Sequence, residues 1–182
     1  MFQTIVVATD LSEASDMVIS CLRGLRGLGT RKVVLAHALG VRYEEEIARL
    51  LSQMAQSKLA QQRATIEDQG FQVALEVGPG TPMLEVNRIA KEHQASLVVV
   101  GSLGATCARE GLLGGTALAI LHRAEIPVLV VRVQVTEPGT KEKCRAIWRT
   151  SRSMFFSRRI SRTTPRKPSR RSSNWRRTAC IA

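Results

Sequence analysis

Five short runs of mostly β-branched residues, separated by stretches with helical periodicity, constrain this chain more than any other feature of its sequence. Three of the runs are nearly continuous apolar segments, which is typical of strands covered on both faces. Strands that alternate with helices form a parallel sheet with right-handed crossovers. We therefore predict an α/β domain with a doubly wound, five-stranded parallel sheet. The runs cover residues 4–8, 32–38, 71–77, 96–100 and 128–133.

Four helices are predicted between these strands. Ser12 can cap a helix that runs to about Leu28. A long amphipathic helix carries apolar residues at helical spacing from Ile47 to Ile66. Pro82 takes the favoured first position of the third helix, and the fourth begins at about Gly115.

The charge of the chain is divided between two unequal parts. Residues 1–135 hold 13 basic residues (Lys or Arg) and 13 acidic residues (Asp or Glu), whereas residues 136–182 hold 14 basic and 2 acidic residues. The whole net charge of +12 therefore lies in the last part. We predict a domain over residues 1–135 and a basic, disordered tail over residues 136–182.

Two interpretations of the tail stay open. Arginines interspersed with Trp148, Phe155 and Trp175 would suit a basic arm that binds RNA, DNA or an acidic surface. Alternatively, the tail has no selected function, because an excess of Arg and Ser is typical of a GC-rich gene read out of frame. Codons permitted for residues 153–161, read two bases out of frame, can encode His-Val-Leu-Phe-Pro-Thr-Asp-Phe-Ser. Our favoured hypothesis is a frameshifted second copy of the first domain.

Several protein classes are excluded by the composition. The four cysteines are widely spaced and form no C-x-x-C pair, so we expect neither a zinc knuckle nor a disulfide framework. No stretch approaches the roughly 20 apolar residues of a membrane-spanning helix. The first residues lack the basic region of a signal peptide. We expect a cytoplasmic protein with no membrane partner.

The densest glycine signal follows the fourth predicted strand. Gly101 and Gly104 come first, and Gly114 and Gly115 follow after nine intervening residues, at the start of the last helix. Glycine lets a ligand approach the backbone, and free N–H groups at a helix start favour an anion. The pattern is neither a Walker A loop nor G-x-G-x-x-G. Taken alone, the same glycines could simply form turns.

The spacing G-x2-G-x9-G at the end of an α/β domain resembles that of the universal stress proteins. The opening Ala8-Thr9-Asp10-Leu11-Ser12 is similar to the family's first strand and its aspartate, and Ile126-Pro127-Val128-Leu129 resembles its last strand. The resemblance covers about residues 1–133. It implies the sheet order 3-2-1-4-5 and, in the ATP-binding branch, a bound adenine nucleotide.

The resemblance also implies a nucleotide site. Asp10 and the backbone at Ala8 and Ala38 would face the adenine and ribose, and the phosphates would lie on the last helix. The cofactor would be ATP, with any Mg²⁺ carried by the nucleotide. The predicted binding residues are Ala8, Thr9, Asp10, Ala38, Val100, Gly101, Gly104, Gly114, Gly115, Thr116 and Ala117.

One position departs from the family's pattern. The ATP-binding motif has Ser or Thr directly after the third glycine, where this chain has Gly115. A lost neutral hydrogen bond costs about 0.5–1.5 kcal/mol, and more when the acceptor is charged, unless Thr116 supplies the hydroxyl. The departure keeps an alternative open, a dimeric protein-interaction module of the same family that binds no nucleotide.

No catalytic or metal-binding constellation is evident. His37, His93 and His122 show no ligand spacing, and His37 is expected to be a packed, hydrogen-bonded residue inside the second strand. No nucleophile lies beside a positioned base. We expect a regulator that is not an enzyme, in which any slow ATP hydrolysis is incidental.

The last predicted strand presents an alternating edge. An exposed edge pairs readily with another chain. The resemblance implies a homodimer through the residues from Val128 to Val133. Nucleic acid would be a partner only if the tail is functional.

Overall fold

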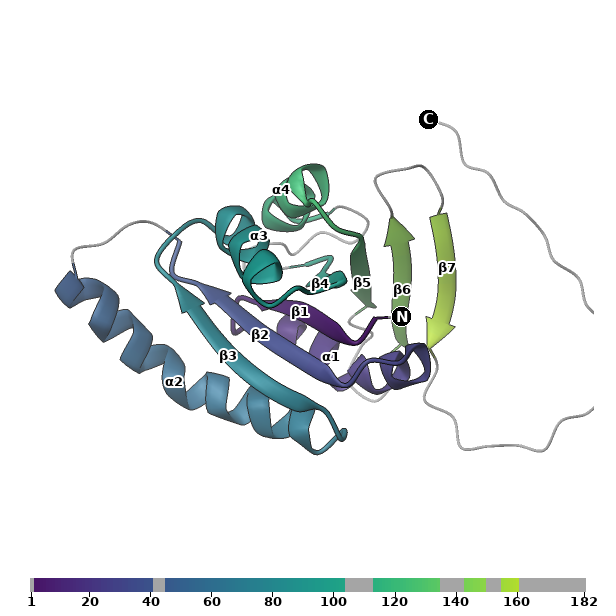
Figure 1. Ribbon diagram of the computed structural model, residues 1–182, viewed down its shortest axis with the longest axis horizontal. Coiled ribbons are helices and arrows are strands. Elements are labelled where there is room, and N and C mark those ends of the chain that lie inside the picture. Colours follow the sequence, from purple (N-terminus) through teal and green to yellow (C-terminus); the bar gives the residue numbers. More distant parts are fainter. Residues whose placement is uncertain (1, 41–44, 104–112, 135–142, 150–154, 161–182) are drawn as a thin grey trace, which may run out of the picture.

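The computed structural model describes residues 2–40, 45–103, 113–134, 143–149 and 155–160. Strands and helices alternate along most of the chain and form three layers, with the sheet between two layers of helices (Figure 1). The parallel strands are β1 (Thr4–Thr9), β2 (Lys32–Ala38), β3 (Gln72–Gly78), β4 (Leu97–Gly101) and β5 (Val128–Gln134).

The strand order confirms the predicted doubly wound sheet. β1 pairs in parallel with both β2 and β4, while β3 extends the sheet beyond β2 and β5 extends it beyond β4. The order is therefore β3-β2-β1-β4-β5 over the parallel strands. The chain changes direction across the sheet between β1 and β4, and ligands of open α/β sheets bind at such a point.

The helices cover the two faces of the sheet in pairs. α1 (Glu13–Ser20) and α2 (Glu45–Glu67) lie on one face, and α3 (Pro82–Glu92) and α4 (Gly115–Arg123) on the other (Figure 1). Val7 packs in the apolar cluster of the first face and Val6 in that of the second. This alternation along β1 explains why its residues read as continuously apolar.

The first predicted helix is shorter than expected. Ser12 caps α1 as predicted, with its side chain accepting a hydrogen bond from Ser15 N at 3.3 Å. The prediction that the helix reaches Leu28 is wrong, because α1 ends at Ser20 and a 3₁₀ helix, η1 (Leu22–Leu28), follows. The glycines of η1 weaken an α-helix, and a turn of three residues lets Leu22 and Leu25 share one buried face.

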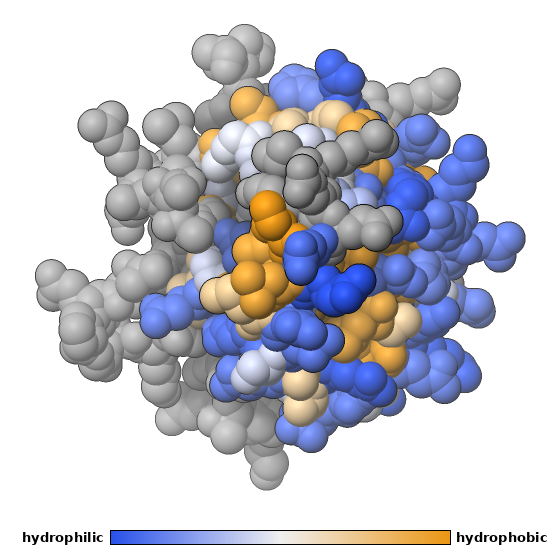
Figure 2. All heavy atoms as spheres, turned by 90° about the vertical axis from the view of Figure 1, so that its left-hand side faces the viewer, coloured by the Kyte–Doolittle hydropathy of each residue, from blue (hydrophilic) through white to orange (hydrophobic). Residues whose placement is uncertain are grey.

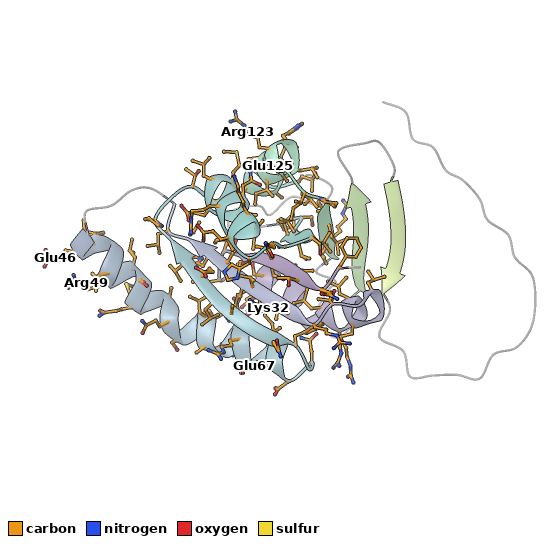
Figure 3. The ribbon with its side chains drawn as sticks, viewed as in Figure 1. Lys32, Glu46, Arg49, Glu67, Arg123 and Glu125 are labelled. Carbon is orange, nitrogen blue, oxygen red and sulfur yellow. The ribbon has the colours of Figure 1, made fainter. Side chains whose placement is uncertain are left out.

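α2 extends past the end of the sheet. Its second half packs as predicted, and Leu59, Gln62 and Ile66 are buried. In its first half, Leu50 is 58% exposed and Met54 is 71% exposed, so these apolar positions lie outside the core. Glu46 and Glu67 mark the two ends of this helix (Figure 3). Seen from the side of α2, apolar side chains gather among hydrophilic ones (Figure 2).

Two antiparallel strands in the tail correct a prediction. β6 (Lys143–Arg149) pairs with β5, and β7 (Phe155–Ile160) pairs with β6. We expected no strand in residues 136–182, but the open edge of β5 offers unpaired N–H and C=O groups that a following segment can use. Because β6 takes this edge, the edge on which the expected homodimer depended is already paired within the chain.

The structure also bears on the expectations about cysteines and about membrane-spanning helices. Cys21, which lies between α1 and η1, is disulfide-bonded. The expectation concerned a disulfide framework, and a bond at one cysteine does not establish one. Across the ranges that the structure describes, no helix is long and apolar enough to cross a membrane.

Candidate functional site

A cavity of about 540 Å³ opens at the carboxyl ends of the parallel strands. Its walls are formed by the ends of β1, β2 and β4 and by the first turns of α3 and α4. The structure thereby brings together the predicted residues Ala8, Thr9, Asp10, Ala38, Val100, Gly101, Gly114, Gly115, Thr116 and Ala117. The eleventh, Gly104, lies outside the described residues.

Asp10 is oriented by the turn that leads into α1. Its Oδ1 accepts hydrogen bonds from Ser12 Oγ at 2.5 Å and from Ser15 Oγ at 2.6 Å. The Ser12 backbone N–H adds a third bond at 3.1 Å. The side chain remains exposed at the cavity, so a carboxylate in a fixed orientation faces any ligand there. Such a carboxylate is suited to accept hydrogen bonds from sugar hydroxyl groups.

His37 lines the cavity, which we did not predict. Its Nδ1 lies 3.0 Å from the Thr9 carbonyl oxygen, so the expectation of a hydrogen-bonded histidine is confirmed. Nδ1 is the donor in this bond because a carbonyl can only accept. In the neutral ring, Nε2 is then an acceptor.

The start of α4 forms one end of the cavity and is suited to an anion. Gly114 is the N-cap and supplies no side-chain bond, and the first turn holds no acidic residue. Gly114 N donates to Ser102 O at 2.9 Å, which ties this helix start to the end of β4. The N–H groups of Gly115, Thr116 and Ala117 have no partner within the helix. Together with the helix dipole, they favour a negatively charged group.

The missing hydroxyl at Gly115 is not a steric necessity. A Cβ added to this residue would meet none of the described residues within 4 Å. Thr116 is exposed and lines the cavity, so a hydroxyl is present one position later.

The opposite wall comes from α3, which the sequence prediction missed. Glu85 is 9% exposed and forms an ion pair with Arg88 at 2.8 Å. Hydrogen bonds to Glu92 and then to Glu85 raise the pKa of Arg88. Pro82 in the sequence could have indicated this wall. As the first residue of α3, it places the first turn of that helix at the carboxyl ends of the strands, where the cavity lies. The other lining residues that were not predicted are Ser15, Ala36, Val86, Leu103, Leu113 and Ile120.

The shape and chemistry of the lining fit a nucleotide. The small side chains of Ala8, Ala36 and Ala38 leave room for a flat group beside the sheet, and Val86 and Val100 add apolar surface. Among the described residues, no group of three or more His, Cys, Asp or Glu side chains is placed to hold a metal ion. Any Mg²⁺ would therefore need oxygen ligands from the nucleotide itself.

Comparison with known proteins identifies the family to which this fold belongs. The model of the universal stress protein family matches residues 1–132. The universal stress protein MJ0577 of Methanocaldococcus jannaschii is 25% identical over 155 residues, which cover 72% of this chain and 96% of that protein. The solved structure of MJ0577 superposes with a TM-score of 0.68 at 27% identity, covering 75% of this chain and 99% of that one.

Two further solved structures share the fold. A universal stress protein in complex with cAMP has a TM-score of 0.53 at 22% identity, covering 70% of this chain and 94% of that one. The universal stress protein of Archaeoglobus fulgidus in complex with dAMP has a TM-score of 0.54 at 23% identity, covering 71% and 98%. With a family model that matches most of its length, this chain belongs to the universal stress protein family.

Proposed function

We propose that the protein binds an adenine nucleotide, ATP, in the cavity at the carboxyl ends of its strands. The observation that carries this proposal is the uncapped start of α4, which opens into a cavity with small apolar residues at its other side. The base would lie beside Ala8, Ala36 and Ala38, and the phosphates on the N–H groups of Gly115 to Ala117, which have no partner within the helix. Asp10 would accept hydrogen bonds from the ribose.

The printed ligands of two structural relatives support an adenine nucleotide. One relative is in complex with cAMP and another with dAMP. These two ligands share the adenine base, while dAMP lacks the 2′-hydroxyl and cAMP has no free 3′-hydroxyl. A site that accepts both ligands would recognise them mainly by the base and the phosphate.

We further propose a regulatory role in the stress response rather than metabolic turnover. Membership in the universal stress protein family supports this role. The nucleotide would act as a signal whose binding changes the state of the protein. The alternative is an interaction module that binds no nucleotide and acts through its surface. A homodimer through Val128 to Val133 would require β6 to leave the edge of β5.

We also propose that the chain consists of two parts with different origins. Residues 1–135 would form the nucleotide-binding domain, and residues 136–182 would be the remnant of a second copy read out of frame. Sequencing the locus tests the second part. A second domain in the alternative frame is the expected result, and its absence would contradict the hypothesis.

Calorimetric titration of ATP·Mg²⁺ into the full chain tests the nucleotide site. We expect saturable 1:1 binding at micromolar to sub-millimolar concentration that persists at about 0.15 M salt. Binding of ATP to the basic tail alone would be weak, would lack a fixed stoichiometry and would fade as salt rises. If no 1:1 binding is found up to millimolar ATP, the interaction module becomes the better account. Phosphate release measured on the same samples would report any slow hydrolysis.

A further inference from the structure

Glu85 places a carboxylate in the wall of the cavity that is formed by α3. The residue is 9% exposed, and it lies in the first turn of the helix. Burial of a carboxylate is costly unless the group is paired or hydrogen-bonded. The partners of its two oxygen atoms therefore indicate what the side chain can still bind.

Only one of the two carboxylate oxygens is used by the described residues. Arg88 donates to Oε2 through Nε at 3.0 Å and through Nη2 at 2.8 Å. The same guanidinium binds Glu92 at 2.6 Å, so it is held between two carboxylates. No residue that the structure describes donates a hydrogen bond to Glu85 Oε1. This oxygen keeps its capacity to accept a bond from a ligand.

Two glycines allow the carboxylate to lie against the turn between β3 and α3. A Cβ added to Gly80 would meet Glu85 Oε1 at 2.5 Å, and one added to Gly78 would overlap Oε2. This turn is bound to the end of β2, since Leu39 N donates to Gly78 O at 2.9 Å and Gly40 N donates to Gly80 O at 3.2 Å. Glu85 is therefore held near the part of the cavity that Ala38 lines.

Glu85 and the start of α4 lie at opposite sides of the cavity. The carboxylate lies against Gly78 at the end of β3, whereas Gly114 is bound to Ser102 just after β4. β2 and β1 separate these two strands, so three steps of about 4.8 Å place them roughly 14 Å apart. A ligand that spans the cavity must carry its anion at the α4 side. At the other side it must offer hydrogen-bond donors, because a second anionic group would be repelled by Glu85.

We infer that Glu85 selects nucleotides whose base carries an exocyclic amine, and that Oε1 accepts a hydrogen bond from that amine. The inference rests on the proposed nucleotide site and adds a specificity-determining residue to it. Adenine has such an amine. Hypoxanthine has a carbonyl oxygen at the same position, and that oxygen would face the carboxylate as a second acceptor. Glu85 thus favours ATP over ITP, its inosine counterpart.

Titration of ATP and ITP into the full chain and into Glu85→Gln tests the inference. A hydrogen bond to a charged group corresponds to about 10- to 100-fold in affinity, so the wild type should bind ATP at least tenfold more tightly than ITP. The glutamine keeps one acceptor but can also donate to the hypoxanthine carbonyl. The preference for ATP should therefore fall to a few-fold or less. Glu92→Gln is the matched control, because it removes the other carboxylate bound to Arg88 outside the cavity, and it should leave the preference unchanged.

The outcomes separate this inference from the proposed function. Equal binding of ATP and ITP by the wild type, or an unchanged preference in Glu85→Gln, would overturn the role of Glu85 and leave the nucleotide site intact. Failure of the wild type to bind either nucleotide would overturn both. Thermal unfolding establishes that the variant folds. If Glu85→Gln does not fold, Glu85→Asp keeps the charge but withdraws it by one methylene, and the same loss of preference is expected.

Discussion

Thr9 Oγ1 donates a hydrogen bond of 2.9 Å to Gln62 Oε1, and so joins the end of β1 to the second half of α2. Gln62 is 2% exposed, and its Nε2 donates to Asp16 Oδ1 at 2.7 Å on α1. Thr9 lines the cavity. A single buried amide therefore ties the cavity wall to both helices on that face of the sheet.

Replacing this amide should destabilise the protein. Gln62→Leu keeps the volume but removes the acceptor of the buried Thr9 hydroxyl and one of the donors to the Asp16 carboxylate, which keeps its ion pair with Lys58. We expect the free energy of unfolding to fall by about 1–3 kcal/mol. Urea denaturation measures this change, and Gln61→Leu at the exposed neighbouring position is the control. Equal stability of the two variants would show that the buried bond contributes nothing.

A hydroxyl at position 115 should strengthen phosphate binding. Within the part of the chain that the structure describes, no atom lies within 4 Å of a Cβ placed on Gly115, so Gly115→Ser displaces none of these residues. We expect ATP to bind several-fold more tightly than in the matched variant Gly115→Ala, which fills the same space without a hydroxyl. Both affinities are measured by calorimetry. Equal affinities would mean that Thr116 already supplies the hydroxyl or that the phosphates lie elsewhere.

Removal of residues 136–182 should change the oligomeric state. In the full chain, β6 pairs with β5 along seven register positions from Val128 to Gln134. Without β6, the edge of β5 is open and can pair with a second copy. Light scattering after gel filtration should give the mass of a monomer for the full chain and that of a dimer for residues 1–135. The same state for both proteins would contradict the role of β6 as the partner of this edge.

The turn between β3 and α3 should not tolerate a side chain at its first glycine. A Cβ on Gly78 would overlap the Glu85 carboxylate, so Gly78→Ala should lower the free energy of unfolding by about 1–3 kcal/mol. Gly27→Ala is the control, because a Cβ there meets nothing within 4 Å. Thermal unfolding of the two variants checks the difference. A Gly78→Ala protein as stable as the control would show that Glu85 moves aside freely.

The parallel sheet and the core of the site were predictable because their signals are local. Continuous β-branched runs are typical of buried strands. Gly101 and Gly114, which line the cavity, belong to a glycine pattern that would let a ligand approach the backbone. The contribution of Glu85 was missed because it depends on the tertiary contact of α3 with the turn after β3. His37 was predicted as a hydrogen-bonded residue, but its place in the cavity wall follows from the neighbouring strand.

The strands of the tail were missed for a different reason. In β6, charged residues at 143, 145 and 149 alternate with Cys144, Ala146 and Trp148, but Ile147 interrupts this period of two and the surrounding tail is rich in arginine. A strand also forms only where a partner edge is available, and the edge of β5 is known only once the sheet has been assembled. The length of α1 was overestimated because helical spacing alone does not distinguish an α-helix from the 3₁₀ turns of η1.

The central claim is that phosphate groups bind on the start of α4, and a charge placed there tests it most directly. Calorimetry should compare ATP binding to Thr116→Glu and to Thr116→Gln, which have nearly the same shape. A carboxylate in a first turn favours the helix, so folding should be preserved, but it would repel the phosphates. If phosphates bind there, Thr116→Gln should bind ATP within a few-fold of the wild type, and the affinity of Thr116→Glu should fall more than tenfold. Equal affinities in the two variants would contradict it.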